Sequence, residues 1–214
     1  MQQKSGIRKT VALLVVFILL VVGGFTWRIN QPVILSTEEL RINGAMVLDK
    51  PRIFSDFELL DHRGELFDLA RLQGVWTILF FGFTHCPDIC PTTMAILNDT
   101  YSKLKEAEKE QLQVVMISLD PERDSVAKLA QYVPYFNPEF IGVTGNKHLI
   151  RRLTAEINIA YNRVPLGDSD YTVDHSTQLV LINPKGHYHG FFRAPHSETT
   201  LRSTWRSIRA SSGL

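Results

Sequence analysis

Residues 75–91 read VWTILFFGFTHCPDICP, an apolar run followed at once by a turn that carries the only two cysteines of the chain, Cys86 and Cys90. The nearly unbroken apolar run over residues 75–81 is typical of a central parallel strand covered on both faces. A helix that begins after such a strand presents unpaired N–H groups, which favour anions such as thiolate. The segment therefore predicts sulfur chemistry where a buried strand meets a helix.

The spacing of the two cysteines brings them within reach of each other. If the residues from Pro87 onward are helical, positions four apart lie on one face, with Cβ atoms about 5–6 Å apart. That separation permits a disulfide, whose Cα atoms usually lie about 4.4–6.8 Å apart. It also permits two thiolates to bind one soft metal ion.

Three interpretations of the pair remain open from the residues alone. Free cysteine is often a small buried hydrophobe, but this does not explain why the only two lie together beside prolines. The second interpretation is a dithiol redox pair with one residue more than the Cys-x-x-Cys spacing. The third is a metal site. A closed zinc site needs four nitrogen or sulfur ligands, whereas two thiolates and one imidazole suit copper.

The N-terminus predicts a membrane anchor. Lys4, Arg8 and Lys9 precede an apolar stretch over residues 11–22 that continues to Trp27. This pattern is typical of a membrane-inserting segment whose positive flank stays in the cytoplasm. Its length lies between the about 7–15 residues of a signal-peptide core and the about 20 of a spanning helix. Because no small-x-small cleavage site follows, an uncleaved anchor is favoured over a cleaved signal.

The rest of the chain fits a single domain. Its 23 Lys and Arg residues nearly balance its 22 Asp and Glu residues, so no basic surface for nucleic acid is indicated. We predict a basic flank and anchor over residues 1–30, a linker over 31–46, one domain over 47–210 and a tail over 211–214. With the positive flank inside, the domain faces the periplasmic or extracytoplasmic side of the cytoplasmic membrane, where disulfides persist.

Strand and helix signals alternate along the domain. Strands are expected at residues 54–59 and 66–68, paired as a hairpin, and at 114–119, 140–143, 178–182 and 188–192. Helices are expected at 92–108, 146–153 and 197–208, and another is expected to follow the turn and cap at 120–125 and to run to about residue 132. Residues 157–172 carry weak signals and are expected to form a loop or extension that brings His175 toward the thiols. The order predicts an α/β, thioredoxin-like fold with a central mixed β-sheet flanked by helices.

Three motifs, in this order and spacing, resemble the Sco/SenC family. They are FTHCPDICP at residues 83–91, SLDPERD at 118–124, and VDHS at 173–176 followed by LINPKG at 181–186. The similarity covers roughly residues 47–209, and the N-terminal anchor is typical of the family. One position departs from the pattern, since Asn183 stands where an aspartate is expected. That turn lies outside the expected metal site, so the departure concerns loop geometry.

The resemblance implies a membrane-tethered copper protein that helps assemble the binuclear copper centre of cytochrome c oxidase. Its metal ligands would be the thiolates of Cys86 and Cys90 and the imidazole of His175, in the domain over residues 47–210, with Cu(I), Cu(II) or both as the bound ion. The implied partner is the copper-bearing oxidase subunit, with other copper carriers or thiol reductases as further partners. From its spacing alone, His175 would more often be a structural residue than a ligand.

Two functions from different classes remain open. A metallochaperone would hold copper and pass it to the thiols of a partner by ligand exchange, without turnover. A thiol-disulfide oxidoreductase would instead use Cys86 and Cys90 as a redox pair to reduce the cysteines of an oxidase subunit. His175 separates the two, because a plain reductase has no need of an imidazole ligand. Enzymatic activity is left open, with the metallochaperone favoured.

Five further side chains each have a functional and a plain interpretation. Asp174 could orient the ring of the neighbouring histidine or be an ordinary exposed carboxylate. His85 could tune the adjacent thiol, although a solvated turn residue that points away from the sulfurs is the simpler interpretation. His187 and His189 alternate along a strand and could form a weak accessory metal site, or share a surface by chance. Asp88 could tune the thiols or cap the following helix.

Overall fold

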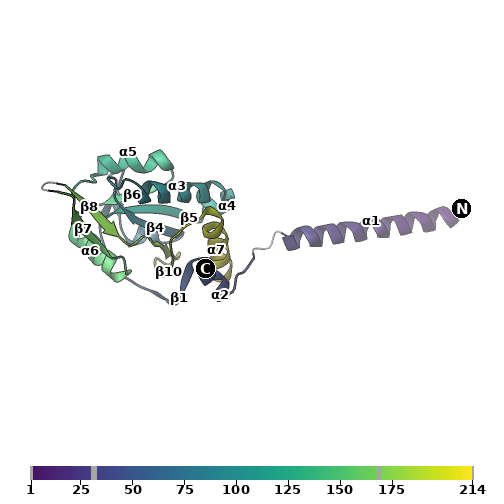
Figure 1. Ribbon diagram of the computed structural model, residues 1–214. Helices are drawn as coiled ribbons and strands as arrows, with labels where there is room; N and C mark the ends of the chain where they lie inside the picture. The colour runs from purple at the N-terminus through teal and green to yellow at the C-terminus, as the bar shows by residue number, and fades with distance from the viewer. Residues whose placement is uncertain (1, 30–32, 168–169, 214) are drawn as a thin grey trace. The chain divides into compact units, whose positions relative to one another are not determined.

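The structure is a computed structural model that describes residues 2–29, 33–167 and 170–213, with only the backbone described for residues 2–5. The chain divides into two compact units, Met1–Ile34 and Leu35–Leu214. Each unit is described separately below (Figure 1).

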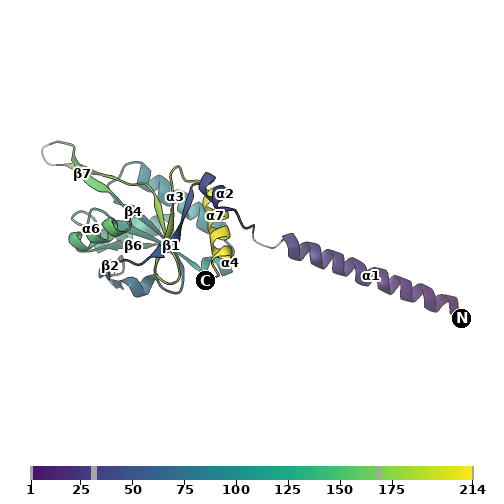
Figure 2. The same cartoon turned by 90° about the horizontal axis from the view of Figure 1, so that it is seen from below.

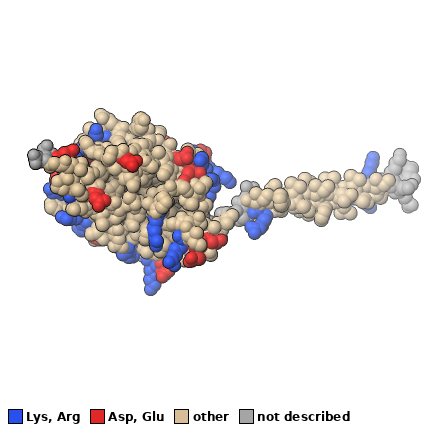
Figure 3. All heavy atoms as spheres, in the orientation of Figure 1, with Lys and Arg blue, Asp and Glu red and all other residues tan. Residues whose placement is uncertain are grey.

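The first unit is an apolar helix, α1 (Gln2–Ile29). Its 24 residues from Gly6 to Ile29 are apolar enough to cross a membrane, and at 1.5 Å per residue they span about 36 Å against a hydrocarbon core of about 30 Å. Figure 3 shows the middle of this helix free of charged side chains. The helix is therefore a candidate anchor. A signal sequence would have the same length and composition, so retention of the segment stays a prediction.

Within the described residues, the second unit contains a sheet of eight strands in the order β1-β10-β9-β4-β5-β6-β2-β3. The strands are β1 (Ala45–Arg52), β2 (Leu59–Asp61), β3 (Leu66–Phe67), β4 (Trp76–Gly82), β5 (Leu112–Ser118), β6 (Ile141–Thr144), β9 (Leu179–Ile182) and β10 (Tyr188–Phe192). The neighbours β4, β5 and β6 are parallel, and the other pairs are antiparallel. Every residue of β4 is buried, as its unbroken apolar sequence predicts. The expected mixed sheet is confirmed.

Helices cover both faces of this sheet, which confirms the predicted α/β class. They are α2 (Thr37–Ile42), α3 (Ile89–Ser102), α4 (Glu106–Lys109), α5 (Val126–Phe136), α6 (Lys147–Glu156) and α7 (Glu198–Ser211), with a short 3-10 turn at Leu69–Leu72. The crossovers from β4 through α3 to β5, and from β5 through α5 to β6, place α3 and α5 on one face, because parallel crossovers are right-handed. Helix α6 lies on the opposite face (Figures 1 and 2).

A separate hairpin stands beside the main sheet. It consists of β7 (Tyr161–Pro165) and β8 (Tyr171–His175), which pair antiparallel with Tyr161 opposite His175. This is the segment expected as a loop or extension that carries the histidine. An extension is what the structure shows. Its strands escaped prediction because β7 is mostly exposed and only Val173 of β8 is buried, so neither strand has a clean apolar alternation.

The segment predicted as a linker differs in the structure, because the compact unit already begins at Leu35. Ser36 caps α2 through a capping box with Glu39, and Leu40 is buried. The chain then enters β1, which pairs with β10 from Ala45 onward. From its sequence alone, a short capped helix with a single buried side chain resembles a polar connector. Its position in the fold depends on contacts with distant parts of the chain, which the local sequence does not reveal.

Two predicted elements are displaced or divided. The helix expected over residues 92–108 ends at Ser102, and α4 starts separately after Lys105, whose N–H donates to the Glu108 carboxylate at 2.8 Å. The first strand of the hairpin expected at 54–59 begins only at Leu59. Phe54 and Phe57 are both buried three residues apart, a spacing that does not fit the alternation of a strand.

Gly190 offers a test of the β1–β10 pairing. A Cβ atom at this position would overlap the carbonyl oxygen of Met46 on the facing strand. We expect Gly190→Ala to destabilise the domain by about 3 kcal/mol, the upper end for overpacking, which lowers the melting temperature by about 6–12 °C. Gly64→Ala is the control, since nothing lies within 4 Å of its Cβ and only its positive φ of 81° is strained. Equal melting temperatures of the two variants in a calorimetric scan would contradict the predicted clash.

Candidate metal centre

Three segments meet at one edge of the sheet. Strand β4 ends at Gly82 and leads into the cysteine loop, while Leu119, which follows the parallel strand β5, donates its N–H to the Gly82 carbonyl at 2.8 Å. Strand β9 runs antiparallel to β4, so the chain that enters β9 from His175 arrives at the same edge. The carboxyl ends of parallel strands are the usual place for sites in open α/β sheets.

Cys90 lies in the first turn of α3 and is fully buried. Its sulfur lies against the backbone of Gly82, where an added Cβ would come within 2.9 Å of Sγ. Burial raises the pKa of the Cys90 thiol well above its usual value. The backbone N–H of Phe83, which donates to the sulfur, lowers this pKa, and the nearby Cys86 thiol raises it further. Cys90 is therefore held as a neutral thiol until something displaces its proton.

Cys86 occupies a different setting. Helix α3 begins at Ile89, so Cys86 lies in the preceding turn, where its N–H donates to the Phe83 carbonyl at 3.3 Å. The expectation that both cysteines share one helix face is wrong, because Asp88 has a non-helical backbone (φ −139°, ψ −65°) that starts the helix later than Pro87. Cys86 is half-buried, and both thiols are free.

His175 lies at the end of β8 with its ring against Cys90. The His175 Nε2 atom is 3.7 Å from Cys90 Sγ, and Nδ1 is 2.9 Å from the carbonyl oxygen of Ser176. Since a carbonyl only accepts hydrogen bonds, Nδ1 carries the proton of the neutral ring and the Nε2 lone pair faces the sulfur. The ring of Phe83 meets the imidazole edge-on, with centroids 6.1 Å apart.

The acceptor that orients this ring was not foreseen. Sequence reasoning offered Asp174, but that carboxylate is exposed, and the Ser176 carbonyl occupies the Nδ1 position. Successive strand residues point to opposite faces, so Asp174 points away from the face that carries its neighbour. The orienting role proposed for Asp174 is therefore wrong.

The structure brings together part of the predicted ligand set. Cys90 and His175 are adjacent, and Cys86 is close enough to influence the pKa of Cys90. Among the residues that the structure describes, no three His, Cys, Asp or Glu side chains form a ready metal cage. The donor types and the direction of the Nε2 lone pair fit a soft metal ion, and the Cys86 thiol lies within hydrogen-bond reach of the Cys90 thiol.

A buried carboxylate supports the cysteine loop. Asp124 is fully buried and accepts the Thr84 N–H at 3.0 Å, the Thr84 hydroxyl at 2.6 Å and the Ser118 hydroxyl at 2.7 Å. His85 bonds the Thr84 hydroxyl at 3.2 Å and lies 3.8 Å from Asp124. His85 thus faces this network and not the sulfurs, as expected. The role of Asp124 was missed, although its place in the SLDPERD motif was the available signal.

The structure also shows the surroundings of the other residues that the sequence singled out. Asp88 stands at the N-cap of α3, but its side chain makes no capping bond, so that expected role is wrong. The ring of His189 packs edge-on against Trp76 at 5.0 Å, and burial lowers the pKa of His189. Within the described residues, His189 and His187 belong to no metal-binding group. Asn183 accepts N–H groups from two following residues through its side chain, as an aspartate would.

Comparisons with known proteins identify relatives of this architecture. The SCO1/SenC family model matches residues 46–209. The chain is 39% identical over 151 residues to a putative copper-binding protein of Stutzerimonas stutzeri, covering 71% of this chain and 74% of the relative. It is 39% identical over 158 residues to the mitochondrial SCO2 homolog of Mus musculus, covering 72% of this chain but only 62% of that relative. The crystal structure of Arabidopsis thaliana ScoI with copper bound matches with a TM-score of 0.68 at 37% identity, covering 73% of this chain and 98% of that chain.

The unequal burial of the two thiols predicts unequal reactivity. In the folded, reduced protein we expect iodoacetamide to modify Cys86 at least about ten times faster than Cys90, because the thiolate is the reactive form and burial both hides Cys90 and raises its pKa. Peptide mass spectrometry of timed samples measures the two rates. In guanidinium the rates should converge. Equal rates in the folded protein would count against the buried position of Cys90.

Proposed function

This chain belongs to the SCO1/SenC family, and from that premise we propose that it is a membrane-tethered copper metallochaperone. We propose that Cys86, Cys90 and His175 bind the copper and that the protein delivers it toward the binuclear copper centre of cytochrome c oxidase. Two matched proteins support copper as the cargo, the putative copper-binding protein of Stutzerimonas stutzeri and the copper-bound ScoI of Arabidopsis thaliana.

The observation that carries the proposal is the 3.7 Å separation between Cys90 Sγ and His175 Nε2. Around Zn²⁺, a first-row ion whose bond lengths serve here as a guide for copper, a thiolate sulfur typically lies at about 2.3 Å and an imidazole nitrogen at about 2.0–2.1 Å. At bond angles between tetrahedral and trigonal, those lengths separate the two donor atoms by about 3.5–3.8 Å. The pair therefore has the spacing of two ligands of one ion.

The three donors would serve both oxidation states of copper. Two thiolates favour Cu(I), whereas an imidazole also suits Cu(II). Binding requires Cys90 to lose a proton that burial holds tightly, so copper uptake should release protons and weaken as the pH falls. Cys86, the more accessible thiol, is the donor that an incoming partner ligand would replace first during transfer.

The N-terminus supports a proposed placement of the domain. Helix α1 would anchor the chain in the cytoplasmic membrane, with its basic flank inside and the domain on the periplasmic or extracytoplasmic side. The copper-bearing subunit of cytochrome c oxidase would be the recipient. Other copper carriers or thiol reductases would supply the metal or keep the dithiol reduced.

A thiol-disulfide oxidoreductase is the second candidate function, favoured by the unequal burial of Cys86 and Cys90. In this reaction the Cys86 thiolate attacks a disulfide of the partner and forms a mixed disulfide, while one partner thiolate leaves. Cys90 then loses its proton and attacks Cys86, which releases the second partner thiolate and forms the Cys86–Cys90 disulfide. Two electrons pass to the partner, and an external dithiol would have to restore the pair.

The role of His175 can be tested by its removal. We expect His175→Ala to abolish tight Cu(II) binding, because the imidazole is the donor that Cu(II) needs most, while Cys86 and Cys90 still cycle between thiol and disulfide. Cupric titration followed by absorption, together with thiol counting, measures both properties. His187→Ala is the control, since that ring lies outside the site. An unchanged cupric spectrum in His175→Ala would remove this residue from the ligand set.

Cysteine substitutions do not distinguish the two candidate functions, but the metal content and thiol state of the purified protein do. Cys86→Ser and Cys90→Ser should each destroy copper retention and any dithiol reductase activity, since both mechanisms need the pair. Protein purified anaerobically from its own membrane should carry about one equivalent of copper if it is a carrier. A metal-free, fully reduced dithiol would favour the reductase instead.

A further inference from the structure

The hairpin that carries His175 has limited backbone attachment to the domain. Strands β7 and β8 form their own sheet and, among the described residues, do not join the eight-stranded one. At the base, the Ser176 N–H donates to the Ala160 carbonyl at 2.9 Å, and from there the hairpin projects outward (Figure 2). The position of the His175 ring therefore depends on side chains that attach the hairpin to the scaffold.

Tyr171 lies on the face of β8 that also carries His175. Side chains alternate along a strand, so Tyr171, Val173 and His175 point the same way. Val173 is 4% exposed, which shows that this face turns toward the domain. Tyr171 is four residues from the histidine, about 13 Å along the strand, and a contact there would hold the whole strand against the domain.

The contact partner of Tyr171 is a buried carboxylate. The Tyr171 hydroxyl donates to Asp120 Oδ1 at 2.7 Å. Arg163, on the other strand of the hairpin, donates to the same oxygen at 3.4 Å. Asp120 is fully buried just beyond β5, and Arg123 binds its second oxygen. Hydrogen bonds to an ionised acceptor are stronger than neutral ones. One carboxylate thus binds both strands of the hairpin.

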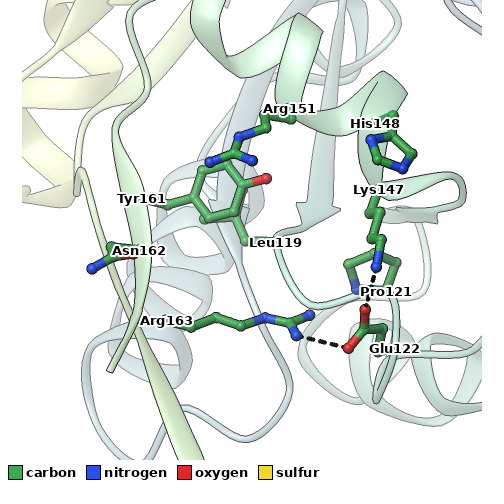
Figure 4. A pocket seen from close by; sticks show the side chains of 9 residues that line it. All are labelled: Leu119, Pro121, Glu122, Lys147, His148, Arg151, Tyr161, Asn162 and Arg163. Carbon is green, nitrogen blue, oxygen red and sulfur yellow. Dashed lines mark hydrogen bonds and ion pairs between the residues drawn. The ribbon is translucent and has the colours of Figure 1, made fainter. Parts of the chain in front are cut away.

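Two arginines contact the Tyr171 ring. The guanidinium carbon of Arg123 lies 3.8 Å from the ring centroid and that of Arg163 lies 4.7 Å from it, and Arg123 also donates to the Tyr171 carbonyl at 2.9 Å. Figure 4 shows Glu122 between Arg163 and Lys147, which it binds at 2.7 Å and 3.0 Å. The hairpin is therefore held by the loop after β5 and, through Lys147, by α6.

The same loop supports the other half of the site. Asp124 lies four residues after Asp120 and holds Thr84, two residues before Cys86. We propose that Asp120 and Tyr171 are positioning residues that hold the hairpin so that His175 Nε2 faces Cys90. This inference rests on the proposed role of His175 as a copper ligand. Loosening the anchor should weaken the contribution of the imidazole and leave the thiols unaffected.

The substitution Tyr171→Phe removes the hydroxyl and keeps the ring that the two arginines contact. In the full-length protein in detergent, we expect it to weaken Cu(II) binding about tenfold, the loss typical when a residue that supports a metal ligand is removed. Cu(I) binding, which two thiolates can sustain, should change much less. In metal-free protein, hydrogen exchange should accelerate over residues 161–165 and 171–175 and stay unchanged in the cysteine loop.

A double-mutant cycle separates positioning from general damage. If Tyr171 acts through His175, then Tyr171→Phe should have no further effect on Cu(II) affinity in the His175→Ala protein. An equal loss in both backgrounds would overturn the inference. Tyr101→Phe, a half-buried tyrosine on α3, is the matched control and should bind copper normally.

The remaining outcomes distinguish this inference from the proposed function. Wild-type Cu(II) affinity in Tyr171→Phe, with affinity lost in His175→Ala, would overturn the anchor and leave the ligand assignment intact. Unchanged affinity in His175→Ala would overturn the proposed function itself. If Tyr171→Phe does not fold, Arg163→Gln replaces it, because that side chain is 39% exposed. A smaller loss of Cu(II) affinity in the same direction is then expected, and no loss would overturn the anchor.

Discussion

Two buried carboxylates in one short loop, Asp120 and Asp124, bind the two segments that make up the candidate metal centre. A buried ionised group costs much free energy unless hydrogen-bond donors surround it, so each carboxylate dictates which groups must approach. Asp124 draws in the Thr84 N–H and hydroxyl ahead of the cysteines, and Asp120 draws in Tyr171 and Arg163 from the hairpin. Because the loop follows β5, a buried strand inside the sheet, both anchors are tied to the core of the domain.

The site joins one fully buried donor, Cys90, to two half-buried ones, His175 and Cys86. Cys90 and His175 lie against each other at the edge of the core, while Cys86 stands half-buried in the turn before α3. In a carrier, this arrangement keeps two ligands in place while the third exchanges with a partner. In a reductase, the same arrangement would suit an attacking thiol and a resolving one. A plain reductase has no need of the imidazole, whereas a Cu(II) site does.

Three strands that were predicted accurately share one physical cause. The buried strands β4, β5 and β9 are almost wholly apolar, so local composition alone reveals them. The helix α6 also begins where expected, because Asn146 supplies a capping side chain to the His148 N–H. The capped helix α2 and the hairpin β7–β8 were missed, since few of their own residues are buried and their stability comes from contacts with distant segments.

For the site, the residues indicated the chemistry, and the fold determined the geometry. Two cysteines after a buried strand, and a histidine before another, were visible as a soft donor set, and their motifs indicated the family. The late start of α3 placed Cys86 outside the helix, and strand alternation turned Asp174 away, leaving the Ser176 carbonyl to orient the ring. Backbone angles and long-range packing set these positions, and neither can be worked out from the types of the neighbouring residues.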